Sequence, residues 1–308
     1  RLLGGTSDAI PDQRGRVALV TGANSGRGLE TTRALIGRGC TVLMACRSAR
    51  KGEAARAQLL GAGTAGLDLL ELDLSDLNSV ASCARDVADR YGRLDLLINN
   101  AGLMAPPRML SRQGYELQFG VNHLGHFALT QALLPLMNDR PHARVVTVTS
   151  GAQYFGVMAW DDLQGEQRYD RWKAYSQSKL ANVMFALELN QRLQASGSAV
   201  RSLAAHPGLA RTNLQPVSVA ATGAWQEALA YRLMDPFFQS AAQGALPQLY
   251  AATASDAQGG EHYGPSQLGG LRGDPKQQPV ARAAKDQSQR QRLWTVSESL
   301  TEHHSAAV

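Results

Sequence analysis

A tyrosine and a lysine four residues apart, Tyr175 and Lys179, could act as an acid–base pair, because residues at this spacing share one face of a helix. A phenol with a pKa of about 10 exchanges protons poorly at neutral pH, and a neighbouring cation lowers that pKa by favouring the phenolate. Upstream, Ser150 ends a predicted strand, where its hydroxyl can bond to a substrate oxygen. The Tyr-Lys spacing alone is common by chance, so its meaning depends on the elements around it.

A glycine-rich run, Thr21-Gly-Ala-Asn-Ser-Gly-Arg-Gly28, follows a predicted strand and opens a predicted helix. Glycine allows a tight turn and lets backbone N–H groups approach a pyrophosphate. The start of the helix adds unpaired donors and a partial positive charge. Such a turn can be an ordinary loop, but its place in the first strand–helix unit favours dinucleotide binding.

The end of the second predicted strand indicates which dinucleotide is preferred. A carboxylate there would hold the ribose 2′-hydroxyl of NAD, whereas an arginine suits the 2′-phosphate of NADP. The chain has Arg47 at this point, Lys51 nearby and no acidic residue from Cys40 to Lys51. Arg47 could simply be exposed at a strand end, but charge-assisted bonding to a phosphate makes NADP(H) the predicted cofactor.

Two asparagine-containing segments complete the polar set. Asn99-Asn100-Ala101-Gly102 follows a predicted strand, and its small residues would let the backbone pass close to a cofactor. Asn122 lies within a predicted helix, where an amide is a mediocre helix former. It is tolerable there if it bonds a freed backbone group or a water, although an isolated asparagine is more often an ordinary surface residue.

The strands and helices that position these side chains are indicated by an alternation of short apolar runs and longer stretches at helical spacing. Strands are predicted at 17–20, 41–45, 67–72, 94–98, 144–149 and 200–205. Helices are predicted to about residue 38, over 51–60, from Ser75 or Asp76 to 91, over 174–193 and around 281–300. The alternation predicts an α/β fold: a single doubly wound Rossmann-type domain, with a parallel sheet of about seven strands and helices on both faces.

The chain is expected to consist of a lead (residues 1–14), the domain (15–265) and a C-terminal extension (266–308). Within the domain, residues 213–242 break the strand–helix rhythm and form an insertion at the edge of the sheet where ligands bind. This insertion is mostly apolar, so it favours a hydrophobic substrate, but it could equally pack on a partner subunit. Tyr154 and Phe155 could line the substrate site or pack in the core.

Composition excludes several other classes of protein. The chain has 31 Lys and Arg against 26 Asp and Glu, a balance of +5, but the basic residues are scattered, which argues against nucleic acid. Three cysteines without a CxxC pair argue against a disulfide framework and a zinc site. No apolar run approaches the roughly 18 residues of a membrane span, and no secretory signal is expected, so we expect a cytoplasmic protein.

Six motifs occur together and in order. They are TGxxxGxG, NNAG, VNHLGHF, the strand-end Ser150, YxxxK and His206-Pro207-Gly208. From about Gly15 to Pro265 the chain resembles the short-chain dehydrogenase/reductase family. The runs YSQSKLAN, ACRS and LYAAT are similar to its retinol dehydrogenase-like group, which includes relatives of protochlorophyllide reductases. The family carries histidines such as His123 and His126 without metal, so no metal site is expected.

The resemblance implies that Tyr175 is the general acid/base, that Lys179 lowers its pKa and binds a ribose, and that Ser150 polarises the carbonyl. Asn122 would hold a water in a proton relay to Lys179. Asp73 and Leu74 would contact adenine, and the residues from Pro207 on would flank the nicotinamide. The full set of implied cofactor contacts is Gly22, Asn24, Ser25, Gly26, Arg27, Gly28, Arg47, Lys51, Asp73, Leu74, Asn100, Ala101, Gly102, Tyr175, Lys179, Pro207, Gly208 and Thr212.

Arg27 departs from the family pattern, which usually has Ile or Leu between the last two glycines of the turn. Because a buried unpaired guanidinium is costly, Arg27 should either extend outwards or reach the cofactor phosphates, and we favour the second.

The resulting hypothesis is an NADPH-preferring oxidoreductase that interconverts a carbonyl and an alcohol on a small, hydrophobic, retinoid-like substrate. A reductase of C=C bonds and a low-turnover cofactor-binding regulatory protein are the alternatives. No nucleic-acid partner is expected, and a homodimer or homotetramer is left open.

Overall fold

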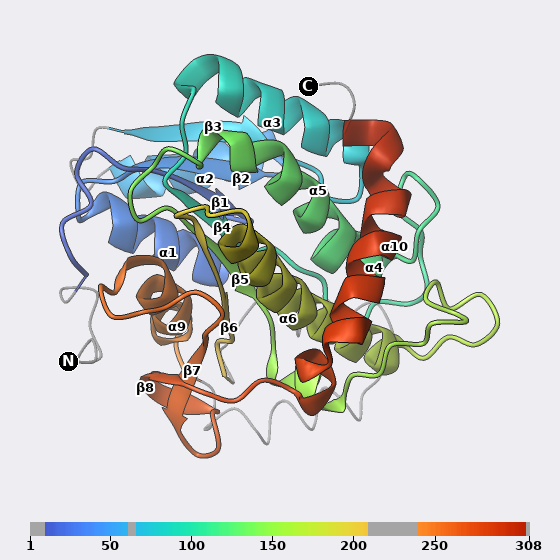
Figure 1. Cartoon of the computed structure of the whole chain (residues 1–308). Coiled ribbons are helices and arrows are strands. Elements are labelled where there is room, and N and C mark those ends of the chain that lie inside the picture. Colours follow the sequence, from blue (N-terminus) through green and yellow to red (C-terminus); the bar gives the residue numbers. More distant parts are fainter. Residues whose placement is uncertain (1–9, 61–65, 209–238, 306–308) are drawn as a thin grey trace.

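The computed structural model describes residues 10–60, 66–208 and 239–305 of the chain (Figure 1). Within these residues, eight strands form one sheet in the order β3-β2-β1-β4-β5-β6-β7-β8. Their bounds are β1 (Val17–Thr21), β2 (Thr41–Cys46), β3 (Leu67–Glu71), β4 (Leu96–Asn99), β5 (Arg144–Val148), β6 (Arg201–Ala205), β7 (His262–Gln267) and β8 (Arg272–Gln277). The first seven pair in parallel, and β8 pairs antiparallel with β7. The predicted α/β fold is confirmed, with one further antiparallel strand in a segment whose sequence shows only a polar tail.

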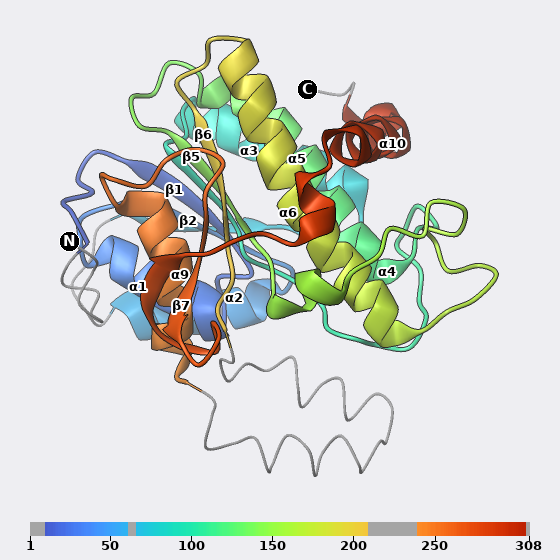
Figure 2. The same cartoon turned by 60° about the horizontal axis from the view of Figure 1, so that its bottom comes forward.

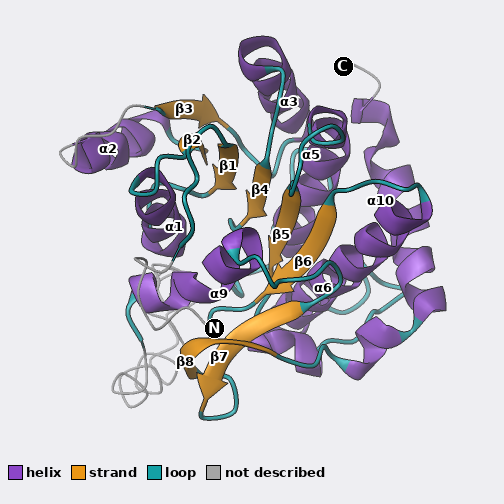
Figure 3. Ribbon diagram, turned by 60° about the vertical axis from the view of Figure 1, so that its left-hand side comes forward, coloured by secondary structure: helices purple, strands orange, loops and turns teal. Residues whose placement is uncertain are grey.

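Helices cover both faces of the sheet, as Figure 3 shows. Helices α1 (Gly26–Ile36), α2 (Ala49–Leu60) and α9 (Ala241–Thr253) pack on one face, and α3 (Leu77–Tyr91), α5 (Gly125–Leu133) and α6 (Arg171–Ala195) pack on the other. The shorter segments are α4 (Leu117–Phe119), a π-helical turn η2 (Gly120–Leu124), and the 3₁₀ turns η3 (Leu134–Leu136), η4 (Gly151–Phe155) and η6 (Arg282–Lys285).

The central strands are buried on both faces, which explains their continuous apolar runs. In β1, Val17 and Leu19 pack into the core beneath α3 and α5, whereas Ala18 and Val20 pack into the core beneath α1 and α9. Because side chains alternate across a strand, a sheet with helices on both faces needs apolar residues at successive positions. Among the described residues, no helix combines the length and the apolar character needed to cross a membrane.

The helix beginnings differ in a way that bears on ligand binding. Asp76 caps α3 by accepting from the N–H of Asn78, which settles the predicted choice between Ser75 and Asp76. Asp170 caps α6 through the N–H groups of residues 172 and 173. Ser25 stands at the same position before α1 but makes no side-chain cap. The first backbone donors of α1 are therefore not satisfied by a side-chain cap.

The chain after β7 is part of the fold. Helix α10 (Gln287–Ser305) packs along α6, α5 and α3 (Figure 2), and its Trp294 stacks among Phe127 and Phe185 at centroid distances of 5.0 and 6.0 Å. The predicted division at residue 265 falls inside β7. Most of the predicted lead and insertion, and Thr212, lie outside the described residues.

Candidate active site

The carboxyl ends of the strands meet at one edge of the sheet, and the strand order reverses direction at β1 and β4. At this edge lies a cavity of about 500 Å³, here called the main cavity. The predicted cofactor residues that line it are Gly22, Asn24, Ser25, Gly26, Arg27, Gly28, Arg47, Asp73, Leu74, Asn100, Ala101 and Gly102. Residues from four separate predicted motifs thus form one continuous wall.

Other predicted contacts lie elsewhere. Lys51 is exposed on α2, outside the lining of the main cavity, and Thr212 is outside the described residues. The turn Pro207-Gly208 follows β6: Gly208 has φ of +67°, and a Cβ on it would lie 2.4 Å from the carbonyl oxygen of Leu271. Several lining residues were not anticipated, namely Ala45, Leu72, Ser75 and Leu103. They are small or aliphatic residues with no distinguishing spacing, so the sequence gives no signal for them.

The glycine turn has the shape that a dinucleotide requires. Gly22 has φ of +66°, and a Cβ on it would lie 3.1 Å from the Cβ of Ala101. A Cβ on Gly28 would lie 2.2 Å from the carbonyl oxygen of Gly22, so this position accepts only glycine. Because Ser25 leaves the start of α1 without a side-chain cap, backbone N–H groups and the helix dipole remain to bind an anion such as a pyrophosphate.

A buried hydrogen-bond network joins this turn to the neighbouring strand. The Thr21 hydroxyl oxygen accepts from the N–H groups of Asn100 and Ala101, both at 2.9 Å. The Asn100 side chain donates to the Thr21 carbonyl at 2.9 Å. Asn100 therefore braces the carboxyl ends of β1 and β4 against each other. For Asn99, the side chain donates to the Thr130 hydroxyl at 3.0 Å.

His126 extends the same network towards Asn122, a connection that the sequence analysis did not anticipate. Its Nδ1 lies 3.1 Å from the Asn122 carbonyl oxygen and its Nε2 lies 2.9 Å from the Thr21 hydroxyl. A carbonyl only accepts, so Nδ1 carries the proton and Nε2 accepts from Thr21. Burial lowers the pKa of His126 to about 4, so the ring stays neutral.

The four predicted catalytic residues come from three elements. Tyr175 and Lys179 lie on α6, Ser150 follows β5, and Asn122 lies in the π-helical turn η2. Such turns often occur at functional sites because they displace a backbone group from its usual partner. Lys179 Nζ lies 5.8 Å from the Tyr175 ring centroid. A Cβ on Gly102 would lie 3.3 Å from Lys179 Nζ and 3.1 Å from the Asn122 amide oxygen. Lys179 and Asn122 therefore meet beside Gly102, which lines the main cavity.

Both polar groups of the Asn122 side chain have hydrogen-bond partners within the protein. Its amide nitrogen donates to the Ser178 hydroxyl at 2.9 Å and to the Leu103 carbonyl at 3.0 Å, and its oxygen accepts from the Leu103 N–H at 2.7 Å. This amide thus fixes the segment that follows Gly102, which explains why an asparagine is tolerated inside a helix.

Charges around Tyr175 differ from the sequence-based expectation. Burial raises the pKa of Tyr175, and two effects oppose that rise: a hydrogen bond from Ser150 and the positive charge of Arg27. Burial, followed by repulsion from Arg27, lowers the pKa of Lys179 to about 7. Arg27 is thus a second cation beside the phenol, in addition to Lys179, and Lys179 is itself shifted towards its neutral form.

Arg27 is half-buried and lies in the wall of the main cavity. Its Nε is buried and has no hydrogen-bond partner. Burial lowers the pKa of the guanidinium, and attraction to Tyr175 opposes this. The guanidinium is therefore not extended into solvent, and a contact with the cofactor phosphates stays a prediction.

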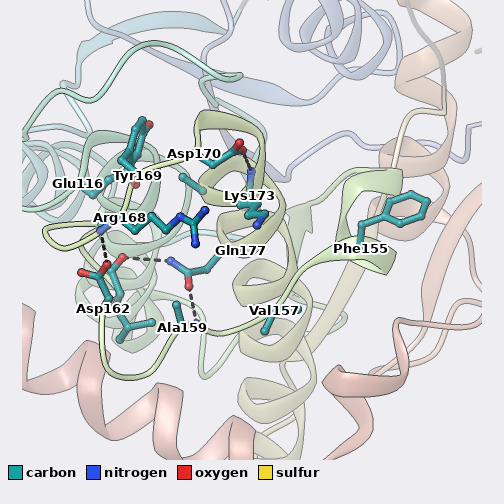
Figure 4. A pocket seen from close by; sticks show the side chains of 13 residues that line it. Glu116, Phe155, Val157, Ala159, Asp162, Arg168, Tyr169, Asp170, Lys173 and Gln177 are labelled. Carbon is teal, nitrogen blue, oxygen red and sulfur yellow. Dashed lines mark hydrogen bonds between the residues drawn. The ribbon is translucent and has the colours of Figure 1, made fainter.

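A second cavity of about 380 Å³, the side pocket, lies beside the start of α6 (Figure 4). Phe155, Arg168 and Gln177 are among its lining residues, and Phe155 is 83% exposed, so core packing is excluded for it. Tyr154 instead donates its hydroxyl to the Pro279 carbonyl at 2.8 Å. Ala174 and Gln177, on either side of Tyr175 in the sequence, also line this pocket.

The other histidine of this segment, His123, also has structural partners. His123 Nε2 lies 2.7 Å from the Ser297 hydroxyl, and its ring packs among Phe119, Phe127 and Phe185. Within the described residues, no group of three or more His, Cys, Asp or Glu side chains could hold a metal ion.

Comparison with known proteins identifies related chains. The family model described as short chain dehydrogenase matches residues 16–222. Mouse retinol dehydrogenase 12 is 39% identical over 287 residues, which cover 92% of this chain and 85% of that protein. Human retinol dehydrogenase 13 is 37% identical over 306 residues, covering 96% of this chain and 88% of that protein. The solved structure of an uncharacterized protein from Mycobacterium paratuberculosis superimposes with a TM-score of 0.78 at 42% identity, covering 97% of this chain and 98% of that one.

Proposed function

The chain belongs to the short-chain dehydrogenase/reductase family of oxidoreductases, in its retinol dehydrogenase-like group, and we propose that it is an NADPH-preferring enzyme that interconverts a carbonyl and an alcohol. The observation that carries this proposal is that Ser150 and Lys179 both lie against Tyr175, beside a cavity whose wall includes a glycine turn and an uncapped helix start. An acid–base group and an anion site are what hydride transfer with a dinucleotide requires.

When bound, a nicotinamide supplies the hydride to the carbonyl carbon, or accepts it in the oxidative direction. Tyr175 donates its phenolic proton to the oxygen that develops negative charge, and Ser150 stabilises that oxygen with its hydroxyl. Lys179, whose pKa is about 7, can pass a proton back to Tyr175 near neutral pH. Asn122 fixes the backbone beside Lys179 through its hydrogen bonds to Leu103, so its predicted part in the proton relay is to hold this segment in place.

Preference for NADPH is supported by the charges at the end of β2. Arg47 is exposed and lines the main cavity, where it can pair with a 2′-phosphate. Asp73, the nearest carboxylate in the wall, already accepts from the N–H and hydroxyl of Ser75 at 2.9 and 2.6 Å. The carboxylate oxygen of Asp73 is thus bonded within its own loop. Strand β2 contains no acidic residue that could bind the ribose 2′-hydroxyl of NAD.

A hydrophobic aldehyde or ketone is the proposed substrate. Relatives at 36–39% identity are named retinol dehydrogenases, and the segment 213–242 of this chain is mostly apolar. A cytoplasmic location and a homodimer or homotetramer stay predictions from the sequence.

The direct test is a screen of aldehydes and ketones, retinal among them, followed by the loss of NADPH absorbance. We expect turnover with NADPH, slower turnover with NADH, and none above background with Tyr175→Phe. Identification of the product distinguishes an alcohol from a reduced C=C bond. Activity that survives Tyr175→Phe would contradict the mechanism, and turnover of no carbonyl at all would favour a cofactor-binding regulatory protein.

A further inference from the structure

The amino ends of the strands form the opposite edge of the sheet, and a second large cavity lies there. It has a volume of about 490 Å³ and is lined by residues that immediately precede or begin β1, β5 and β6. Because parallel strands have their carboxyl ends at the other edge, this cavity is remote from Tyr175 and the glycine turn. We call it the arginine cavity, since its lining contains Arg14, Arg16, Arg140, Arg144 and Arg201.

Only two acidic side chains line the cavity with these five arginines, Asp12 and Asp95. Asp12 pairs with Arg14 at the rim, where both side chains are exposed. Asp95 is buried, pairs with Arg140 at 3.0 Å and also accepts from the Val17 N–H at 2.8 Å. Both carboxylates therefore already have a basic partner, and three arginines remain without one in the lining.

Those three arginines donate to neutral oxygens. Arg16 donates to the carbonyl of His142 at 2.9 Å and to the Gln13 side chain at 2.9 Å. Arg201 donates to the carbonyl of Ala257 at 3.0 Å. Such bonds orient a guanidinium but do not neutralise it. Asp95 also attracts Arg16, but two carboxylates face five guanidiniums in the lining, so the cavity has a positive field.

Arg144 is the most deeply placed of the five, with 4% of its surface exposed. Its two Nη atoms donate to the carbonyls of Ala251 and Ala254 at the end of α9, at 2.9 and 2.7 Å. Its Nε is buried without a hydrogen-bond partner. Burial, aided by the charges of Arg201 and Arg16, lowers the pKa of Arg144 to about 10, although Asp256 and Tyr263 act in the opposite sense. The carbonyl groups at the end of α9 thus accept from the two Nη atoms of Arg144, and its Nε–H group remains a donor without an acceptor.

The backbone beside Arg16 is also unusual. His142 has φ of +61°, a conformation that residues other than glycine rarely adopt, and its carbonyl is the acceptor for Arg16. Strained residues of this kind persist where the surrounding structure holds them, often at ligand sites.

We propose that the arginine cavity is a second anion site, which binds a small ligand bearing a phosphate group. Guanidinium groups match the oxygens of phosphate in charge and geometry, and the volume lies within the range of sites for small molecules. The ligand's phosphate would supply the counter-charge that Arg16, Arg144 and Arg201 lack in the lining.

The test uses the full chain and inorganic phosphate as the probe, with thermal unfolding as the readout. A ligand that binds only the folded state at ten times its Kd raises the Tm of a protein of this size by about 2 °C. Sodium chloride at equal ionic strength serves as the reference, because screening alone would act through any salt. No phosphate-specific rise up to 50 mM would overturn the proposal.

Arg201→Gln removes one free charge without breaking an ion pair, and we expect it to abolish at least half of the phosphate-induced rise in Tm. Arg201→Lys keeps the charge and should retain part of the rise, which keeps the test valid if the glutamine variant does not fold. Arg56→Gln is the matched control, since Arg56 also donates to a backbone carbonyl but lies on α2. A full rise in Arg201→Gln would overturn the proposal.

Phosphate could also enter the main cavity, so Arg47→Ala is measured in parallel. We expect it to keep the rise in Tm. Loss of the rise in Arg47→Ala together with its persistence in Arg201→Gln would place the phosphate at the main cavity and overturn the second site, whatever the outcome for the proposed enzyme activity.

Discussion

The two edges of the sheet both attract anions, but they do so with different groups. At the carboxyl edge the donors are backbone N–H groups of a glycine turn and the uncapped start of α1, supplemented by Arg27 and Arg47. At the amino edge they are arginine side chains, most of which are already bonded to carbonyl oxygens. A backbone site fixes the position of a phosphate closely, and a cluster of guanidiniums supplies charge with less geometric definition. The edges should therefore respond differently to substitution.

Ser150→Ala at the carboxyl edge is expected to have the largest effect. Loss of a donor to the developing oxyanion should lower kcat/KM by about 10²–10³-fold. The Ser150 hydroxyl also accepts from the Ala152 N–H, so a small loss of stability, about 1 kcal/mol, accompanies it. Steady-state kinetics and thermal unfolding measure both, with Ser176→Ala as the control. A drop in kcat/KM below tenfold would contradict the assigned role.

Asp95→Ala at the amino edge should affect stability and leave turnover per folded molecule unchanged. The substitution leaves Arg140 without its acid and the Val17 N–H without its acceptor. Because Arg140 is 30% exposed, we expect a loss of about 2–3 kcal/mol, somewhat less than for a fully buried pair. Urea unfolding measures the loss. Asp12→Ala, which breaks only the exposed pair with Arg14, should leave the free energy of unfolding almost unchanged. If Asp95→Ala and Asp12→Ala lowered the free energy of unfolding equally, the buried ion pair would contribute no more to stability than the exposed one.

Arg47→Ala tests whether the carboxyl edge recognises a 2′-phosphate. Loss of one charge-assisted contact should lower the ratio of kcat/KM for NADPH to that for NADH by about tenfold, with little change for NADH itself. Arg50→Ala is the matched control, because Arg50 is exposed three residues away and does not line the main cavity. An unchanged ratio would show that another group selects the cofactor.

Arg27→Leu is expected to give the smallest change, a displacement of the pH profile. The charge of Arg27 lowers the pKa of Tyr175 and of Lys179, so its removal raises both. Alcohol oxidation needs the phenolate of Tyr175, so the rising limb of its rate should move to higher pH. Arg33→Leu, in the same helix but paired with Glu30, should not move it. A shift to lower pH would mean that Arg27 acts on another group.

Much of the fold follows from the sequence because its signals are local. The apolar runs predict β1 to β6 within a residue or two, and the spacing of Tyr175 and Lys179 places both on α6. The strand β8 was not predicted, because RGDPKQ carries no apolar run and pairs only by virtue of its neighbour β7. The start of α10 was also misplaced, since residues 281–286 belong mostly to the turn η6.

The sequence by itself determines which residues can do chemistry and in which element each lies, because a motif, a strand and a helix turn are properties of short segments. The tertiary structure decides which of these groups lie close enough to interact. Arg27 acts on Tyr175 from α1, and His126 links Thr21 to the Asn122 carbonyl from α5. Arg144 and Arg201, which begin β5 and β6, gather at the amino edge with Arg16, which immediately precedes β1. Charge and burial act through space over a few ångströms, so they depend on parallel strand order, which brings residues more than a hundred positions apart into one site.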